Sequence, residues 1–141
     1  MFDVKDAGFL IAILKMCDDI ESYKIEYGSI EKTLSKRSGV NAVLMNLSQI
    51  GEYAGKISER TKNNYAAIDW KRIKGLRNII THDYFGVDLE KIQSIISLEL
   101  PELTQTILDI VRSNAKSGKI EPGLINAADD DLKFLRINPL K

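Results

Sequence analysis

One short segment holds three side chains whose types and spacing suit chemistry on a phosphate. The stretch GLRNIITHDYFG, residues 75–86, contains Arg77, the single histidine His82, and Tyr84. A guanidinium binds phosphate oxygens through paired donors, and a histidine exchanges protons near neutral pH. Together they suit metal-independent RNA cleavage, in which a base deprotonates a ribose 2′-hydroxyl and the arginine stabilises charge on the attacked phosphate. Three preceding cations can hold an RNA backbone: Lys71, Arg72 and Lys74.

The spacing of Arg77 and His82 does not suit one continuous helix. Side chains five positions apart on an ideal helix diverge by about 140°. Either the helix ends before His82, or two copies of the segment face each other across a two-fold dimer. Ordinary structural roles are the alternative. The histidine can stabilise a helix C-terminus, the arginine can form a surface ion pair, and Tyr84 can pack in the core.

Apolar residues recur at helical spacing through most of the chain, and no strand-like alternation persists. The pattern predicts helices over about residues 4–27, 38–60, 69–81, 89–99 and 101–116, with a short turn or helical extension over 29–36. Asp69 and Asp88 are the expected N-caps of the third and fourth helices. Pro101 predicts an extended Leu100 and the first turn of the fifth. The predicted class is all-α, an up-and-down helical bundle of four to five helices.

Two other segments carry local information. Gly51 and Gly55 lie four residues apart in the second helix, which predicts the close approach of another helix. Residues 1–116 form the predicted bundle domain. Residues 117–141 contain glycines, prolines and an acidic run without a clear period. They predict an irregular C-terminal arm that belongs to the same domain or is partly mobile.

Composition bounds the functional classes. The 20 basic and 20 acidic residues cancel, which argues against a surface that coats nucleic acid but allows a local basic patch. The lone Cys17 rules out a disulfide framework and a zinc cluster, and it should be buried. No metal site is expected. No secretory or membrane-spanning segment is visible, so we expect a cytoplasmic protein that does not contact membranes.

Arg77, His82 and Tyr84 follow the R-x4-H-x-Y motif of the HEPN superfamily. The chain resembles in particular the HepT toxins of MntA/HepT toxin–antitoxin modules. Three segments follow that family's order and spacing: QIGEYAGKIS (residues 49–58), IDWKRIKGLRNIITHDYFGVD (68–88) and LELPEL (98–103). The resemblance covers roughly residues 5–115, and the tail is longer than the family leads us to expect.

The resemblance implies a homodimer with the motif lining a cleft at the interface, and a metal-independent endoribonuclease of a type VII-like module. Arg77 and His82 would be the catalytic pair. Asn78 would accompany the arginine, and Glu52 would have a structural or a catalytic role. A minimal nucleotidyltransferase antitoxin would neutralise the toxin by adding AMP from ATP to Tyr84, because the added bulk and negative charge repel RNA. Cleavage itself would need no cofactor.

Two other hypotheses remain open on the sequence. In the first, the bundle is a non-catalytic module whose cleft holds a nucleotide or a partner loop, which the near-zero net charge favours slightly. In the second, the protein is an all-α dimer in which His82 only caps a helix end. Incubation of RNA with the pure protein separates catalysis from binding, because a binder leaves the RNA intact.

Overall fold

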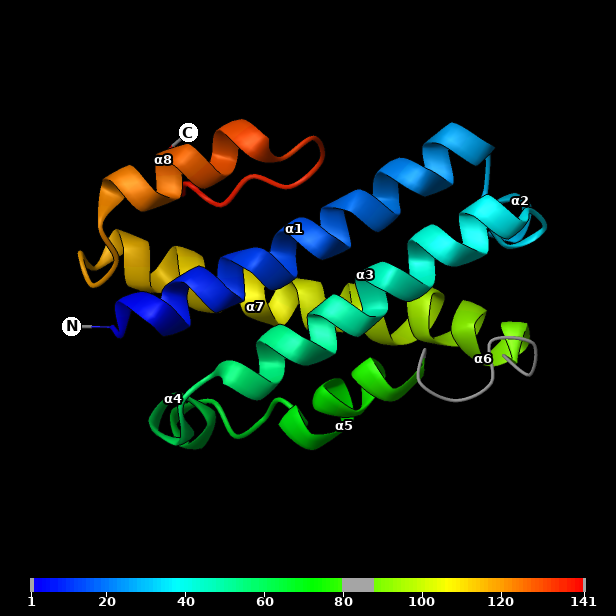
Figure 1. Ribbon diagram of the computed structural model, residues 1–141. Coiled ribbons are helices and arrows are strands. Elements are labelled where there is room, and N and C mark those ends of the chain that lie inside the picture. The colour runs from blue at the N-terminus through cyan, green and yellow to red at the C-terminus, as the bar shows by residue number, and fades with distance from the viewer. Residues whose placement is uncertain (1, 80–87, 141) are drawn as a thin grey trace.

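The computed structural model describes residues 2–79 and 88–140, and all regular structure in these ranges is helical. This confirms the predicted all-α class. In chain order the elements are α1 (Val4–Tyr27), α2 (Ile30–Leu34), α3 (Arg37–Lys56), α4 (Glu59–Asn64), α5 (Trp70–Gly75), the 3-10 turn η1 (Leu76–Ile79), α6 (Leu89–Ser94), the π turn η2 (Ile95–Glu99), α7 (Leu100–Lys116) and α8 (Pro122–Asp131). Figure 1 shows α1, α3, α5 with η1, and the α6–η2–α7 run alternating in direction, with α8 beside α1.

α1 forms the centre of the bundle. It packs against α3, α7 and α2. Its inward side chains are fully or almost fully buried: Leu10, Ile13, Leu14, Cys17 and Ile20. Burial raises the pKa of the Cys17 thiol to about 11, so the thiol stays protonated and unreactive at neutral pH. The expected burial of Cys17 is confirmed. In the described part of the chain, no helix combines the length and apolarity needed to cross a bilayer.

The prediction of an extended Leu100 before Pro101 is wrong. Leu100 has φ −64° and ψ −40°, and the helix continues from α6 into α7. The amide of Leu100 donates to the carbonyl of Ile95, five residues back, so this turn is wider than an α-helical turn. A wider turn accommodates a proline that has no N–H to donate and whose ring would clash within an ordinary α-helix.

The prediction of an irregular arm is wrong for Pro122–Asp131, which form α8. Two buried carboxylates fix the chain that follows. Asp18 in α1 accepts hydrogen bonds of 2.8–2.9 Å from three consecutive backbone amides: Lys133, Phe134 and Leu135. Asp129 accepts from the amides of Ile137 and Asn138 at 2.6 and 3.1 Å. The segment after α8 is therefore held in place by hydrogen bonds from its backbone amides. These bonds do not require apolar side chains at regular spacing, so the sequence of the segment shows no apolar period.

A third buried carboxylate joins α1 to α4. Asp6 accepts from the Ser58 amide at 3.0 Å, from the Ser58 hydroxyl, and from Thr61 Oγ1 at 2.6 Å. Burial acts to raise the pKa of Asp6, but these hydrogen bonds outweigh it and the pKa lies below its ordinary value. A lowered pKa means that the carboxylate stabilises the fold above its unfolded pKa of about 3.9, and that this contribution is lost as pH falls through the folded value.

Replacing Asp6 by asparagine should therefore lower the free energy of unfolding by about 1.5–3 kcal/mol at pH 7. The difference from wild type should shrink as pH falls through the lowered pKa of the folded Asp6, because the wild-type carboxylate then becomes protonated. Urea denaturation over a descending pH series from pH 7 measures this change. The exposed Asp130→Asn variant is the control and should match wild type at pH 7. A difference between Asp6→Asn and wild type that does not depend on pH would contradict this role.

Candidate active site

α5, the helix that leads to the motif, begins at Trp70 and has Asp69 as its N-cap. Asp69 accepts a hydrogen bond from the Arg72 amide at 3.1 Å, which confirms Asp69 as the N-cap of α5. Trp70 is buried, and its Nε1 donates to the Tyr65 carbonyl at 3.1 Å. α5 stops at Gly75, and the predicted α-helix over residues 69–81 is replaced at Leu76–Ile79 by the tighter η1 turn. The motif arginine therefore lies on a 3-10 turn.

α3 approaches the backbone of this turn at a glycine. A Cβ atom on Gly51 would lie 2.4 Å from the Arg77 amide nitrogen and 3.0 Å from the Lys74 carbonyl oxygen. No side chain fits in that space, so the expectation of a close helix approach is confirmed at Gly51. The same Cβ on Gly55 would lie 3.6 Å from Lys74 side-chain carbons, which is ordinary contact. The close approach is thus confined to one position, beside Arg77.

Glu52, the next residue of α3, faces the motif arginine. Its Oε2 lies 3.8 Å from Arg77 Nη1, and the two side chains are 45% and 51% exposed. At this distance and exposure the pair stabilises the fold little. It places a carboxylate beside the guanidinium, while the Arg77 side chain as a whole stays half exposed, where a phosphate can reach it. The geometry favours an orienting role for Glu52.

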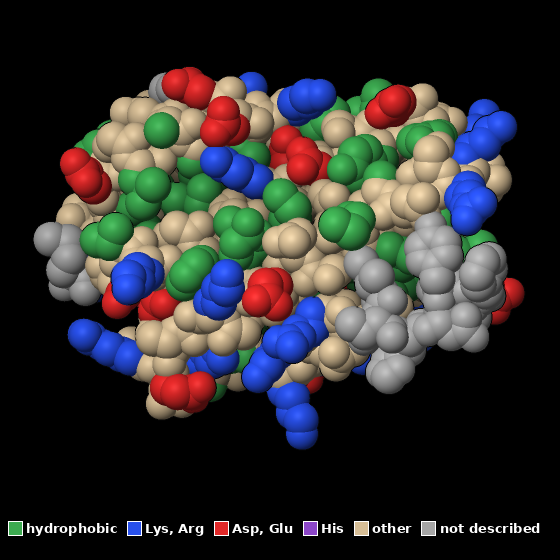
Figure 2. Space-filling model, in the orientation of Figure 1, with side chains coloured by type: hydrophobic (Ala, Val, Ile, Leu, Met, Phe, Trp, Pro, Cys, Tyr) green, Lys and Arg blue, Asp and Glu red, His purple; other side chains and the backbone are tan. Residues whose placement is uncertain are grey.

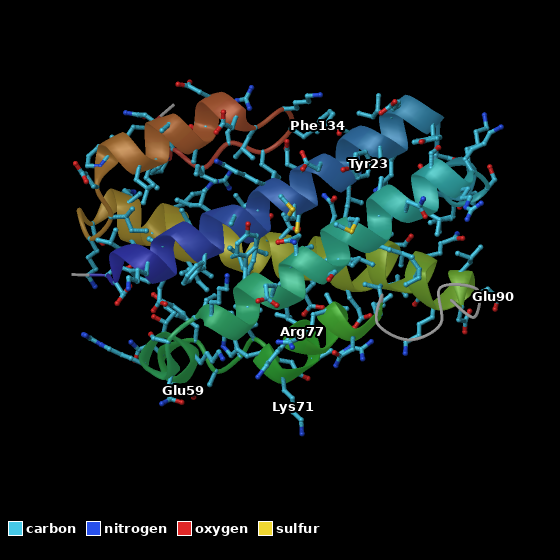
Figure 3. All side chains as sticks on the ribbon, viewed as in Figure 1. Tyr23, Glu59, Lys71, Arg77, Glu90 and Phe134 are labelled. Atoms are coloured by element: carbon cyan, nitrogen blue, oxygen red, sulfur yellow. The ribbon has the colours of Figure 1, made fainter. Side chains whose placement is uncertain are left out.

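The predicted RNA-binding cations Lys71, Arg72 and Lys74 have different surroundings. Lys71 and Lys74 are exposed, and so is Asn78. Figure 3 shows Lys71 pointing away from the bundle, whereas Arg77 lies beside α3. Arg72 instead pairs with Glu99 through both carboxylate oxygens, at 2.9 Å for Nη2. This contact raises the pKa of Arg72 and lowers that of Glu99.

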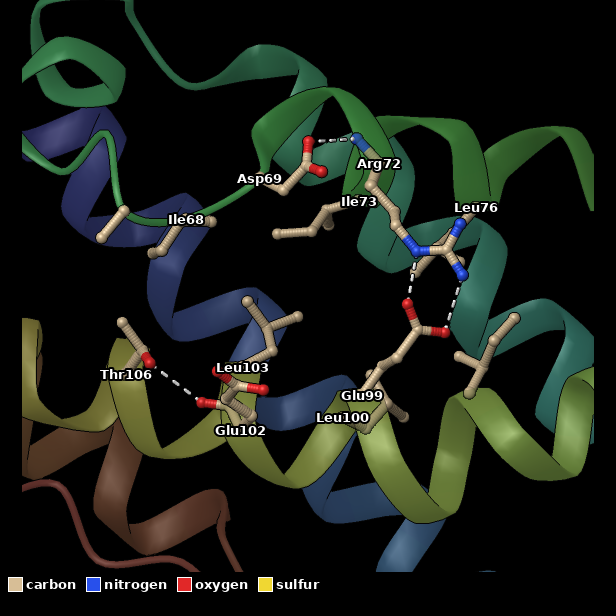
Figure 4. Close-up of a pocket in the computed structure, with 12 residues that line it drawn as sticks. Ile68, Asp69, Arg72, Ile73, Leu76, Glu99, Leu100, Glu102, Leu103 and Thr106 are labelled. Carbon is tan, nitrogen blue, oxygen red and sulfur yellow. Dashed lines mark hydrogen bonds and ion pairs between the residues drawn. The ribbon is translucent and has the colours of Figure 1, made fainter.

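The Arg72–Glu99 pair bridges a cavity of about 210 Å³ between α5 and the η2–α7 run (Figure 4). The cavity walls are mostly aliphatic, with Ile73 and Leu76 on one side and Leu103 on the other. Arg72 therefore connects α5 to the η2–α7 run. Arg77, on η1, is the guanidinium that lies beside α3. Sequence analysis missed Glu99, although its place in the quoted LELPEL segment singles it out as an acidic residue near a proline.

Two motif residues, His82 and Tyr84, lie outside the described residues, so their placement relative to Arg77 remains a prediction. Among residues 2–79 and 88–140, no three His, Cys, Asp or Glu side chains gather as metal ligands. The described half of the site is therefore an oriented arginine, its glutamate partner and neighbouring exposed lysines. Such an arrangement can bind a phosphate and stabilise negative charge on it.

Comparison with known proteins gives a family match and several similar sequences. Residues 13–110 match the family model described as "Ribonuclease HepT-like". The chain is 31% identical to "Putative RNase MJ1216" of Methanocaldococcus jannaschii over 112 residues, which cover 78% of this chain and 88% of that protein. It is 30% identical to "Putative RNase MJ0125" of the same organism over 110 residues, covering 78% and 92%.

A bacterial relative gives a similar value. The chain is 27% identical to "Putative RNase TTE0752" of Caldanaerobacter subterraneus over 104 residues, which cover 74% of this chain and 92% of that protein. No solved structure matches the chain with significance. The matched range 13–110 includes Gly51, Glu52 and Arg77 and excludes α8. The likeness therefore covers the described part of the site and leaves out the C-terminal segment.

Proposed function

The chain belongs to the HepT-like ribonuclease family, and we propose that it cuts RNA with Arg77 and His82 as its catalytic pair. The observation that carries the proposal is the motif arginine, which is half exposed, oriented by Glu52 and held against α3 at Gly51. In the proposed reaction His82 takes the proton from a ribose 2′-hydroxyl. The oxygen then attacks the adjacent phosphorus and forms a 2′,3′-cyclic phosphate, while the bond to the 5′-oxygen of the next nucleotide breaks and that oxygen takes up a proton from water.

Arg77 has the electrostatic role in this reaction. Its guanidinium donates to the phosphate oxygens and stabilises the charge that grows on them as the bond forms. Lys71 and Lys74 hold the flanking backbone, and Arg72 contributes charge while it ties α5 to Glu99. The chemistry proposed uses these side chains alone and needs no cofactor for cleavage.

We further propose that two copies form a homodimer whose motifs line one cleft, and that the protein is the toxin of a toxin–antitoxin module in the cytoplasm. Its antitoxin would be a minimal nucleotidyltransferase that transfers AMP from ATP to Tyr84. The tyrosine oxygen attacks the α-phosphorus and pyrophosphate leaves. The added phosphate places negative charge two residues from His82, and this charge repels an RNA backbone.

The test is induced expression of wild type beside His82→Ala in a bacterial host, with growth and total RNA integrity followed together. We expect growth arrest and RNA fragments with wild type, and neither with His82→Ala. Circular dichroism and analytical ultracentrifugation of the purified variant should show an unchanged fold and dimer. Toxicity retained in a folded His82→Ala protein would overturn the catalytic pair.

Harmless wild type with intact RNA has a different meaning. Mass spectrometry of the peptide that contains Tyr84 then decides the outcome. If the tyrosine carries no AMP, the proposed activity is wrong and the cleft of a non-catalytic binding module is the better explanation. If it carries AMP, the host has supplied the modifying activity, and Tyr84→Phe should restore RNA cleavage.

A further inference from the structure

Two aromatic side chains lie together on the outer side of α1 and α3. The ring centroids of Phe9 and Tyr53 are 6.3 Å apart and the ring planes differ by 28°, so the rings are stacked. Both residues are only partly buried. Lys56 Nζ lies 6.0 Å from the centroid of each ring. We refer to Phe9, Tyr53 and Lys56 as the aromatic platform.

The two rings pack against the edge of the core but are not enclosed by it. The inward face of α3 is filled by aliphatic residues, and Tyr53 lies off that stripe. Within the described ranges, Lys56 has no carboxylate at ion-pair distance. Partly accessible rings beside a cation with no carboxylate at ion-pair distance have the chemistry that binds single-stranded nucleic acid. A base stacks on the rings and its phosphate meets the lysine.

The platform lies next to the candidate active site. Tyr53 directly follows Glu52, whose carboxylate faces Arg77. Lys56 is one helical turn beyond Glu52 and therefore lies on the same side of α3. Figure 2 shows lysine and arginine side chains along one edge of this face, below a band of hydrophobic side chains. An RNA strand whose phosphate is held by Arg77 can thus cross the end of α3 and reach the rings.

A hollow of about 300 Å³ between α1 and α8 adjoins the platform, with Tyr53 on its border. Its other walls are mostly small or flexible apolar residues: Gly8, Ala12, Met16, Leu124 and Ala127. One wall of the hollow belongs to α8, which lies outside the family-matched range 13–110.

We propose that the aromatic platform binds an unpaired nucleotide flanking the phosphate that is cut. The base stacks on Tyr53 and Phe9, and Lys56 contacts the backbone. The substrate class is then single-stranded or looped RNA, because bases within a duplex are already stacked on each other and cannot reach the rings. This inference rests on the proposed ribonuclease function, and it adds the substrate class and the residues that select it.

The test uses a short single-stranded RNA that carries the fluorescent base 2-aminopurine, bound to the His82→Ala protein so that it stays intact. Binding should quench the fluorescence, because the base stacks. Tyr53→Leu in the same background should raise the Kd about tenfold and abolish the quenching, whereas Tyr53→Trp should retain both. Lys56→Ala should raise the Kd a few-fold and reduce its salt dependence.

Phe134→Leu is the matched control. Phe134 is also an exposed aromatic, 44% accessible, but it lies in the segment after α8. This variant should bind and quench like its parent, and duplex RNA of the same sequence should bind at least about tenfold more weakly than the single strand. Circular dichroism of each variant establishes that it is folded.

The outcomes separate the two proposals. If wild type cuts RNA but folded Tyr53→Leu and Lys56→Ala bind and quench like their parent, the platform is wrong and the ribonuclease stands. If wild type binds and quenches the strand but cuts no RNA, the platform stands and the ribonuclease is wrong. If Tyr53→Leu instead weakens self-association and leaves the Kd unchanged, the rings contact a second copy, and the platform is again overturned.

Discussion

Replacing Arg77 by alanine is expected to slow RNA cleavage by about 10²–10³-fold, the usual loss when one preorganised donor to a developing oxyanion is removed. Arg77 is half exposed and Glu52 is its one ion-pair partner in the described structure, at 3.8 Å, so little stability should be lost with it. Single-turnover cleavage of a short RNA by purified protein measures the rate. Thermal unfolding should show a Tm close to that of wild type.

Lys71→Ala is the control for Arg77→Ala, because it removes a neighbouring positive charge that has no proposed role in the chemical step. Lys71 is exposed on α5, which leads directly into η1, and it carries the same charge as Arg77. Its loss removes one backbone contact, which should weaken RNA binding a few-fold and lower the slope of log K against log salt concentration by about 0.7. Arg77→Lys should remain strongly impaired, because an ammonium lacks the planar fork that binds two phosphate oxygens. Equal losses in Arg77→Ala and Lys71→Ala would mean that Arg77 supplies only general charge.

A methyl group at Gly51 should both destabilise the fold and disturb the active site. The added Cβ would meet the Arg77 amide at 2.4 Å and the Lys74 carbonyl at 3.0 Å, and both are backbone atoms that cannot rotate away. Overpacking of this kind costs about 1–3 kcal/mol. Relief requires the backbone of Arg77 to move, and displacement of a catalytic group by about 1 Å can cost 10²-fold in rate. Urea denaturation and single-turnover cleavage of Gly51→Ala measure the two effects.

Gly55→Ala is the matched control, one turn further along α3. Its Cβ would make only ordinary contact with the Lys74 side chain, so the variant should gain about 1 kcal/mol from helix propensity. The two substitutions are chemically identical and share the gain in helix propensity, so they should differ by the overpacking cost of about 1–3 kcal/mol in the free energy of unfolding. Gly51→Ala protein as stable and as active as Gly55→Ala would contradict the close approach of α3 to η1.

Much of this fold was accessible from the sequence. Helical periodicity predicted the bundle, side-chain chemistry predicted the caps Asp69 and Asp88, and the resemblance to HepT proteins is confirmed by the family match. Two features escaped prediction, one through a contact distant in sequence and one through an unusual local turn. The η1 turn forms where α3 presses on its backbone at Gly51, and Leu100 stays helical because the preceding turn is wider. Neither effect leaves a local pattern.

The candidate site divides in the same way. Residue types and spacing were enough to single out Arg77 and the lysines, because the chemistry of each side chain can be read by itself, and the family resemblance singled out Glu52. The pairing of Arg72 with Glu99 joins positions 27 apart, and the stacking of Phe9 on Tyr53 joins two helices. The one available signal was an aromatic residue off the apolar stripe of α3. The catalytic placement of His82 and the modification of Tyr84 remain predictions.

The hydrogen bonds that Asp18 accepts have a consequence for the order of synthesis. They join positions 115–117 apart, so a carboxylate made early must wait for amides made late. At translation rates of 5–20 residues per second the interval is roughly 6–24 s. Over the last part of that interval, from residue 77 to residue 135, Arg77 has been translated but Asp18 in α1 still lacks these hydrogen bonds. A nascent chain therefore acquires its finished bundle only after residue 135 has left the ribosome.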